Sequence, residues 1–151
     1  MKAKGRLLGV DYGTVRVGLA VSDPDRIIAS PLATYTRGAP DADAHYFREL
    51  VQSESIVGLI VGLPVHLSGR EGQKAIEARA FGQWLAAVTD LPLVFYDERF
   101  TTLQAESALW QAGLTHKRRK DRRDRVAAQM LLHAYLSAGC PAEEAPRALD
   151  D

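Results

Sequence analysis

The chain has 151 residues, of which 46% are hydrophobic and 25% are charged. This length and composition are typical of one globular domain that folds without a disulfide or a structural metal. The 19 basic and 19 acidic residues give a formal net charge of zero. The overall charge therefore does not indicate a nucleic-acid-binding protein, and only a local concentration of charge could do so.

The cysteine content and the N-terminal segment bear on the cellular compartment. Cys140 is the one cysteine, so no intrachain disulfide can form, which fits a reducing cytoplasm. The apolar patch before Asp11 is too short for a signal peptide or a membrane span. The four histidines show no spacing typical of a zinc site. We therefore expect a cytoplasmic protein with no membrane segment.

The spacing of apolar residues predicts the elements in chain order. The first half of the chain is predicted to hold strands at 6–12, 16–23 and 27–37, a turn at 38–43, and a helix with an apolar stripe of Tyr46, Phe47, Leu50 and Val51. A strand at 56–65 follows, then a helix at 73–88 with Ile76, Ala80, Trp84, Leu85 and Val88 on one side, and a strand at 91–98. The chain continues with a helix at 101–113, opened by Thr101 and Gln104, and a last helix that begins at Asp124 and is closed by Gly139. Pro31 favours an edge position or a bulge for the third strand. This order predicts an α/β domain over residues 1–139, with a mixed five-stranded sheet flanked by helices, and a polar tail at 140–151.

Acidic residues stand at the tips of two predicted core strands. Asp11 ends the first strand, and Asp97 and Glu98 end the strand at 91–98, with no turn residue between them and the apolar run. Burying an unpaired carboxylate is costly, so such positions call for a reason. The plain alternatives are a turn-forming role for Asp11 and a solvated strand end for the other two, with Arg99 as a local partner.

A third acid, Asp124, stands where the last helix is predicted to begin. It shares one helical face with the apolar residues Ala128, Leu131 and Tyr135. The alternative role is structural, because aspartate is a preferred N-cap residue and is stabilised by the positive end of a helix.

Taken together, these acids predict a metal site. Parallel strands place their carboxyl ends side by side, so groups at those tips can converge. Converging carboxylates repel one another, and Mg²⁺ relieves that repulsion because it prefers carboxylate, water and phosphate oxygens. Two such ions roughly 4 Å apart can activate a water molecule and stabilise the leaving oxygen of a phosphodiester.

Basic and glycine-rich segments complete the candidate site. Residues 117–125 hold seven of the 19 basic residues: Lys117, Arg118, Arg119, Lys120, Arg122, Arg123 and Arg125. Such a run can follow a phosphate backbone, and its alternative is a solvated surface loop. Ser68, with glycines at 69 and 72, lies between a strand and a helix, a layout that either directs backbone N–H groups at a phosphate or merely connects the two elements. Arg16 is a further candidate phosphate contact, or an ordinary exposed strand residue.

Four segments then resemble, in order, the signature blocks of the YqgF/RuvX family. They are GVDYGTVRVGLAVSD, IVGLPVHLSGREG, YDERFTT and DRVAAQMLLHAYL, and the resemblance spans residues 7 to about 137. It implies a ribonuclease H-like fold and a nuclease that uses Mg²⁺ or Mn²⁺. The family is described both as the nuclease that matures the 5′ end of 16S ribosomal RNA precursor and, by analogy with RuvC, as a Holliday junction resolvase.

The resemblance assigns roles to individual residues. Asp11 and Asp124 match two of the family's acids, Glu98 matches the third, and Asp97 is its rival. The residues expected to bind nucleic acid are Arg16, Ser68, Arg99, Thr101, Lys117, Arg118, Arg119, Lys120, Arg122 and Arg123, and Thr102 also falls on a motif position. Two features differ from related enzymes. Arg123 stands where relatives commonly have a hydrophobic residue, and VGLPV carries no acid where related resolvases have a catalytic glutamate.

The family resemblance favours structured RNA, the 16S precursor, over branched DNA as the substrate. A resolvase that cuts two strands symmetrically favours a homodimer, whereas an RNA-trimming enzyme can work alone. Two other classes of function compete with a nuclease. One is a non-catalytic nucleic-acid-binding module that uses the same basic run. The other is a phosphotransferase, because DYGT also resembles a phosphate loop of the actin and sugar-kinase fold, but that fold needs two such domains.

Overall fold

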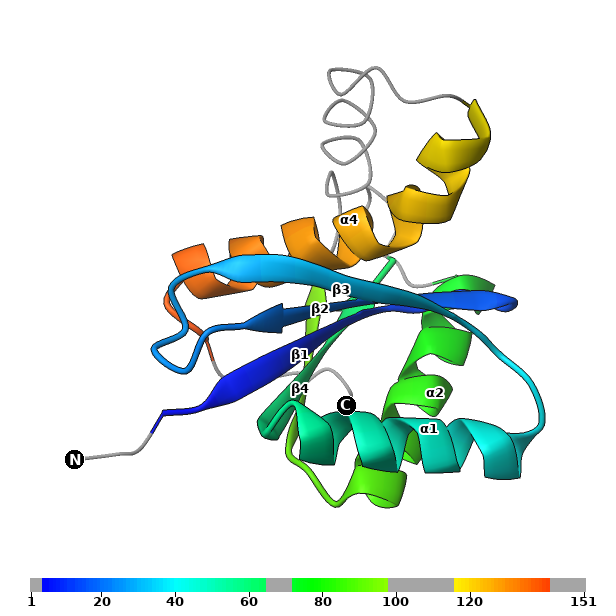
Figure 1. Ribbon diagram of the computed structural model, residues 1–151, viewed down its shortest axis with the longest axis horizontal. Coiled ribbons are helices and arrows are strands. Elements are labelled where there is room, and N and C mark those ends of the chain that lie inside the picture. Colours follow the sequence, from blue (N-terminus) through cyan, green and yellow to red (C-terminus); the bar gives the residue numbers. More distant parts are fainter. Residues whose placement is uncertain (1–3, 65–71, 98–115, 142–151) are drawn as a thin grey trace.

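The structure, a computed structural model, describes residues 4–64, 72–97 and 116–141, the first part of the last segment through its helical backbone (Figure 1). In chain order the elements are β1 (Arg6–Asp11), β2 (Arg16–Ser22), β3 (Ala29–Thr36), α1 (Pro40–Ser53), β4 (Ile56–Leu63), α2 (Gln73–Thr89), β5 (Leu93–Asp97) and α4 (His116–Ser137). The helix expected at 101–113, with its capping residues, lies outside the described residues. Nothing in the described segments is both helical and apolar over the length that a membrane crossing needs.

The five strands form one mixed sheet in the order β3-β2-β1-β4-β5. β1 pairs antiparallel with β2, and β2 with β3, while β4 lies parallel between β1 and β5. β3 is an edge strand, and its register shifts where Ala20 faces Pro31. The expected mixed five-stranded sheet, the antiparallel meander and the edge bulge are therefore confirmed.

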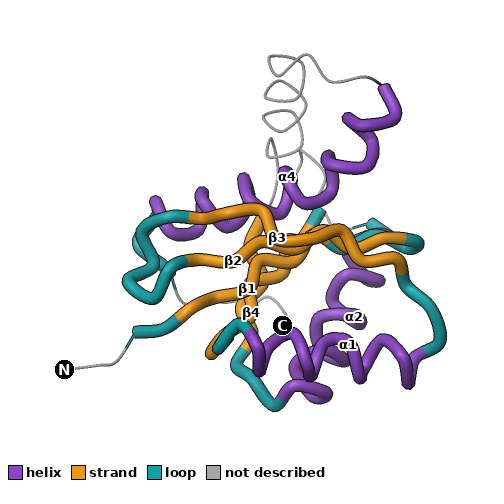
Figure 2. Tube along the Cα trace, in the orientation of Figure 1, coloured by secondary structure: helices purple, strands orange, loops and turns teal. Residues whose placement is uncertain are grey.

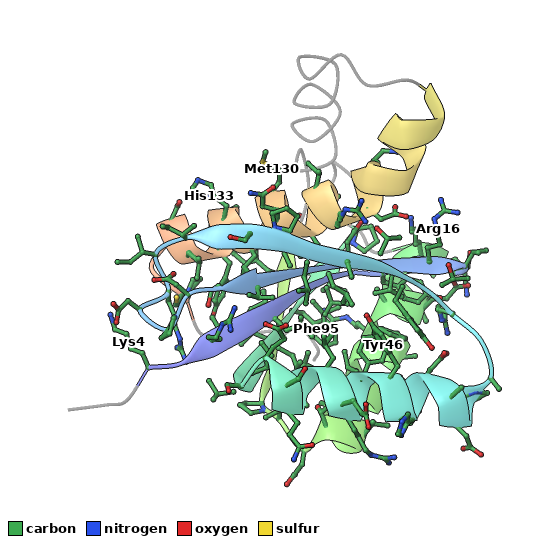
Figure 3. The ribbon with its side chains drawn as sticks, in the orientation of Figure 1. Lys4, Arg16, Tyr46, Phe95, Met130 and His133 are labelled. Atoms are coloured by element: carbon green, nitrogen blue, oxygen red, sulfur yellow. The ribbon has the colours of Figure 1, made fainter. Side chains whose placement is uncertain are left out.

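Helices cover both faces of the sheet. In Figures 1 and 2, α4 lies on one side of the strands, and α1 and α2 lie on the other. Alternation along each strand supplies the two cores, since successive side chains point to opposite faces. Leu8 and Val10 join the core on the α1 and α2 side, whereas Leu7 joins the α4 side. Figure 3 shows the same division, with Tyr46 and Phe95 on the α1 and α2 side.

Glycines let α4 approach the sheet closely. A Cβ on Gly9 would lie 2.9 Å from Cβ of Leu132, and one on Gly18 would overlap the backbone carbonyl of Asp124. Glycine inside a strand often marks such an approach of another backbone. The contact at Gly18 involves main chain, which cannot rotate away, so it fixes the position of Asp124 against β2.

The last helix begins earlier than the sequence suggests. α4 starts at His116, so Asp124 lies more than two turns inside it. Its reading as an N-cap is therefore wrong, and the basic run at 117–125 belongs to a helix and not to a loop. The expected apolar face is correct, since Ala128, Leu131 and Tyr135 are all buried.

Two smaller expectations also fail, the second of them only in part. Residues 40–43 are not part of a turn, because Pro40 occupies the first turn of α1, where its missing N–H costs nothing. In α2 the expected face is right at Leu85, which is buried, and at Trp84, which packs on the core, but Ala75 and Ala78 are buried in place of Ile76, which is 56% exposed. The apolar residues of α2 itself occur on several of its sides, so their spacing alone does not tell which side packs on the sheet.

The Gly18 contact yields a stability prediction. Gly18→Ala should lower the free energy of unfolding by about 1–3 kcal/mol, because the added methyl meets the rigid backbone of α4 at Asp124. Urea denaturation measures the change. Gly38→Ala is the matched control, since its Cβ would lie 3.9 Å from Asp43, an ordinary contact, and should change stability by less than about 0.5 kcal/mol. Equal stability of the two variants would contradict the close approach.

Candidate functional site

Asp11 is the last residue of β1, at the end of the sheet where β1 and β4 both terminate. Leu7 and Gly9 contact the α4 side of the sheet, so the alternation of β1 places Asp11 on that side as well. Asp11 is half-buried. The predicted strand-end position of this carboxylate is therefore confirmed, and it faces the helix that carries Asp124.

Asp124 reaches the same place from α4. Its backbone packs on Gly18, and Gly18 is the residue of β2 that pairs directly with Asp11. Paired residues on neighbouring antiparallel strands have Cα atoms roughly 4.5–5.5 Å apart. The structure therefore brings Asp11 and Asp124 together around Gly18, although they lie far apart in sequence.

Arg16 forms an ion pair with Asp124. Its Nε donates a hydrogen bond to Oδ2 of Asp124 at 2.9 Å, and the two side chains are 35% and 24% exposed. Figure 3 shows Arg16 at the end of the sheet nearest the N-terminal part of α4. Arg16 thus supplies a positive charge within the acidic site. Its expected contact with phosphate stays a prediction.

Asp97 points away from this cluster. It pairs with Leu63, which belongs to the core on the α1 and α2 side, and it follows Phe95 in the alternation of β5 on that same side. Asp97 is exposed at the end of β5. It therefore lies on the opposite face of the sheet from Asp11.

Several predicted site residues lie outside the described residues. These are Glu98, Ser68, Arg99, Thr101 and Thr102. Of the basic run, Lys117, Arg118, Arg119, Lys120 and Arg122 are described only as helical backbone, while Arg123 is half-buried.

In the described segments no group of three or more His, Cys, Asp or Glu side chains could hold a metal ion. Asp11 and Asp124 supply two carboxylates of the kind that Mg²⁺ or Mn²⁺ prefers, and a third ligand has to come from elsewhere.

Arg37 is a residue that the sequence does not reveal. One of its guanidinium nitrogens, NH1, donates to the carbonyl oxygens of Gly13 at 3.1 Å and Thr14 at 3.3 Å. The backbone N–H of Arg37 also donates to the carbonyl of Val15 at 2.9 Å. Arg37 therefore ties down the turn that directly follows Asp11. No local pattern signals this role, because the contacts span more than twenty residues of chain.

Comparison with known proteins agrees with this geometry. A family model described as "RuvX: Holliday junction resolvase" matches residues 5–138. The chain belongs to the RuvX family. Similar relatives carry the name "Putative pre-16S rRNA nuclease". One from Rhodopirellula baltica is 49% identical over 90% of this chain and 79% of its own, and one from Paracoccus denitrificans is 42% identical over 87% and 84%.

Solved structures show the same fold at low sequence identity. RuvC of Thermus thermophilus, in complex with a Holliday junction substrate, has a TM-score of 0.53 at 18% identity, over 89% of this chain and 96% of RuvC. A fowlpox virus resolvase in complex with Holliday junction DNA has a TM-score of 0.56 at 10% identity, over 88% and 97%. The RuvX chain thus has the ribonuclease H-like fold that the four sequence blocks implied.

The ion pair at this site can be measured through a double-mutant cycle. We expect Arg16→Gln and Asp124→Asn to show a coupling energy of about 0.2–1 kcal/mol in stability, because both side chains are partly exposed. The coupling should weaken in about 1 M NaCl, which screens exposed charges. Arg6→Gln combined with Asp124→Asn is the control, since Arg6 pairs with Glu54 instead, and its coupling should be near zero. No difference between the two cycles would contradict the pair.

Proposed function

We propose that this chain is a cytoplasmic, Mg²⁺- or Mn²⁺-dependent endonuclease that matures the 5′ end of 16S ribosomal RNA precursor. One observation carries the proposal: Asp11 at the end of β1 and Asp124 in α4 meet around Gly18, on one face of the sheet. Membership of the RuvX family supports the nuclease activity. The relatives' shared name supports the RNA substrate.

Each residue of the cluster would have a distinct task. Asp11 and Asp124 would hold the metal through their carboxylate oxygens. The metal, when bound, supplies water activation and stabilisation of the leaving oxygen. Arg16 would keep the carboxylate of Asp124 oriented and offset its charge through their hydrogen-bonded ion pair.

Glu98 is our candidate for the third acid. Asp97, its rival, is disfavoured because the alternation of β5 directs it to the opposite face of the sheet from Asp11. No described residue of β4 supplies an acid either, since that strand reads IVGLIVGL. A third carboxylate for this cluster is therefore best sought immediately after β5.

The basic run in α4 would bind the phosphate backbone. Residues 117–125 occupy the N-terminal part of α4, which extends away from the sheet in Figure 1, and Asp124 lies within the same run. A helix that carries cations up to the acidic cluster can hold a phosphodiester strand while its scissile bond lies at the acids. A four-way DNA junction, cut symmetrically by a dimer, is the second candidate substrate, and the family description supports it.

The first test compares the two substrates directly. Purified protein with Mn²⁺ is given a labelled 5′ segment of 16S precursor and a labelled four-way junction. We expect cleavage of the RNA, and we expect Asp11→Asn to reduce its rate at least about 100-fold, because a metal ligand is lost. Asp25→Asn is the control, since Asp25 is exposed in the turn at the other end of the sheet. Paired symmetric cuts in the junction alone would favour a resolvase, and binding without cleavage would favour a non-catalytic module.

The second test identifies the third acid. Glu98→Gln should reduce cleavage as strongly as Asp11→Asn, whereas Asp97→Asn should stay within a few-fold of the unmodified protein. Both variants lose one negative charge at neighbouring positions, so each controls for the other. The Mn²⁺ concentration at half-maximal rate should rise for Glu98→Gln alone. The opposite ranking would transfer the role to Asp97.

A further inference from the structure

A pocket of about 370 Å³ lies beneath the acidic site, on the α1 and α2 side of the sheet. This volume falls within the range of roughly 300–1,000 Å³ that is usual for small-ligand sites. Its lining includes Tyr12, Arg37, Asp43, Glu77, Phe81 and Trp84. Tyr12 directly follows Asp11 in the chain, so the pocket opens beside the end of the strand that carries the acidic site.

The charges in this pocket disfavour an anionic ligand, and the pocket already holds a cation of its own. Two carboxylates, those of Asp43 and Glu77, outnumber the single guanidinium of Arg37, so a phosphate would be repelled. The aromatic rings could attract a cation, but Arg37 already lies over them, with its Cζ 5.3 Å from the ring centre of Tyr12 and 5.1 Å from that of Phe81. A flat, neutral ligand that stacks on rings and donates hydrogen bonds fits these constraints.

Asp43 provides a buried acceptor in the pocket wall. Only 4% of its surface is exposed. Its Oδ1 accepts hydrogen bonds from the hydroxyl of Tyr35 at 2.6 Å and from the backbone N–H of Gly38 at 2.9 Å. Both of these bonds end on Oδ1, and within the described part of the chain none ends on Oδ2. The bond to Asp43, together with burial, raises the pKa of Tyr35 to about 12, so Tyr35 stays protonated and holds the carboxylate in place.

We propose that this pocket binds an unstacked nucleobase of the substrate strand, and that it selects a base with an exocyclic amino group. Trp84, half-buried in the pocket wall, offers a ring face for stacking, and the carboxylates of Asp43 and Glu77 accept the amino hydrogens. A base with a carbonyl oxygen in place of the amino group meets a carboxylate and is repelled. The proposal rests on the nucleic-acid substrate proposed above, and it adds a base-reading site on the other side of the same strand end.

Cytosine and uracil give the sharpest comparison, because they have nearly the same shape, and cytosine carries an amino group at the position where uracil carries a carbonyl oxygen. The Asp11→Asn protein, in EDTA to prevent cleavage, is titrated with labelled UUCUU and UUUUU by fluorescence anisotropy. We expect UUCUU to bind about tenfold more tightly, the scale of one well-formed base contact.

Asp43→Asn should abolish or reverse this preference. The asparagine keeps an oxygen that accepts from Tyr35 and Gly38, but it presents an NH₂ group where the carboxylate presented an acceptor. Asp41→Asn is the matched control, since Asp41 is exposed in the same turn of α1 and does not line the pocket. Should Asp43→Asn not fold, Glu77→Gln carries the same comparison. Equal binding of the two RNAs, or a cytosine preference that survives in both pocket variants, would overturn the proposal.

A second readout separates this proposal from the proposed function. If neither RNA binds, the neutral nucleosides cytidine and uridine are titrated while tryptophan fluorescence is followed, with Trp84→Phe as the control. Quenching by cytidine alone, absent in Trp84→Phe, would support the pocket and reject the RNA substrate. Absence of quenching by both nucleosides would reject the pocket. Equal RNA binding combined with normal cleavage would reject the pocket and leave the nuclease intact.

Discussion

The contact between the backbone of α4 and Gly18 is the constraint on which this site depends. The main chain of Asp124 lies where a side chain at position 18 would be, so the helix and β2 meet without an intervening layer of side chains. Gly18 also pairs with Asp11, so the contact between α4 and Gly18 brings Asp124 close to Asp11. Gly9 repeats the device further along β1, where Leu132 takes the space. Gly9 and Gly18 thus determine how closely α4 packs on the sheet.

Two carboxylates on the same face of the sheet end repel each other, and a positive charge nearby offsets that repulsion. Arg16 supplies this charge from the first residue of β2, two positions before Gly18 and on the same face of the strand. The ion pair between Arg16 and Asp124 remains partly exposed, so water and a divalent ion can reach the carboxylate of Asp124. A fully buried pair would pay a larger desolvation cost and would leave less access.

Much of this arrangement follows from the sequence, because its signals are local. The apolar runs before Asp11 and Asp97 define two strands of the sheet, of which β1 is buried as expected, whereas β5 is only half-buried because it lies at the edge of the described sheet. The start of α4 could not be predicted, because a run of lysine and arginine shows no helical spacing of apolar residues. The sequence therefore suggested Asp124 as the first residue of the helix. The Arg16 pair and the role of Arg37 depend on contacts between distant segments, and no periodicity encodes them. Asp43 was missed because a turn composition at 38–43 hid the first turn of α1.

The two faces of the sheet end divide the chemistry between them. Asp11 projects to the α4 side, where Asp124 and Arg16 lie, and Tyr12 projects to the opposite side, into the pocket wall. Arg37 links the two faces, because it holds the turn after Asp11 by its carbonyl oxygens and also stacks on Tyr12 and Phe81. A ligand that displaced the Arg37 stack would therefore act on the turn that fixes the end of β1. A base bound in the pocket as proposed would thus lie beside the same Arg37 side chain that holds the turn after Asp11.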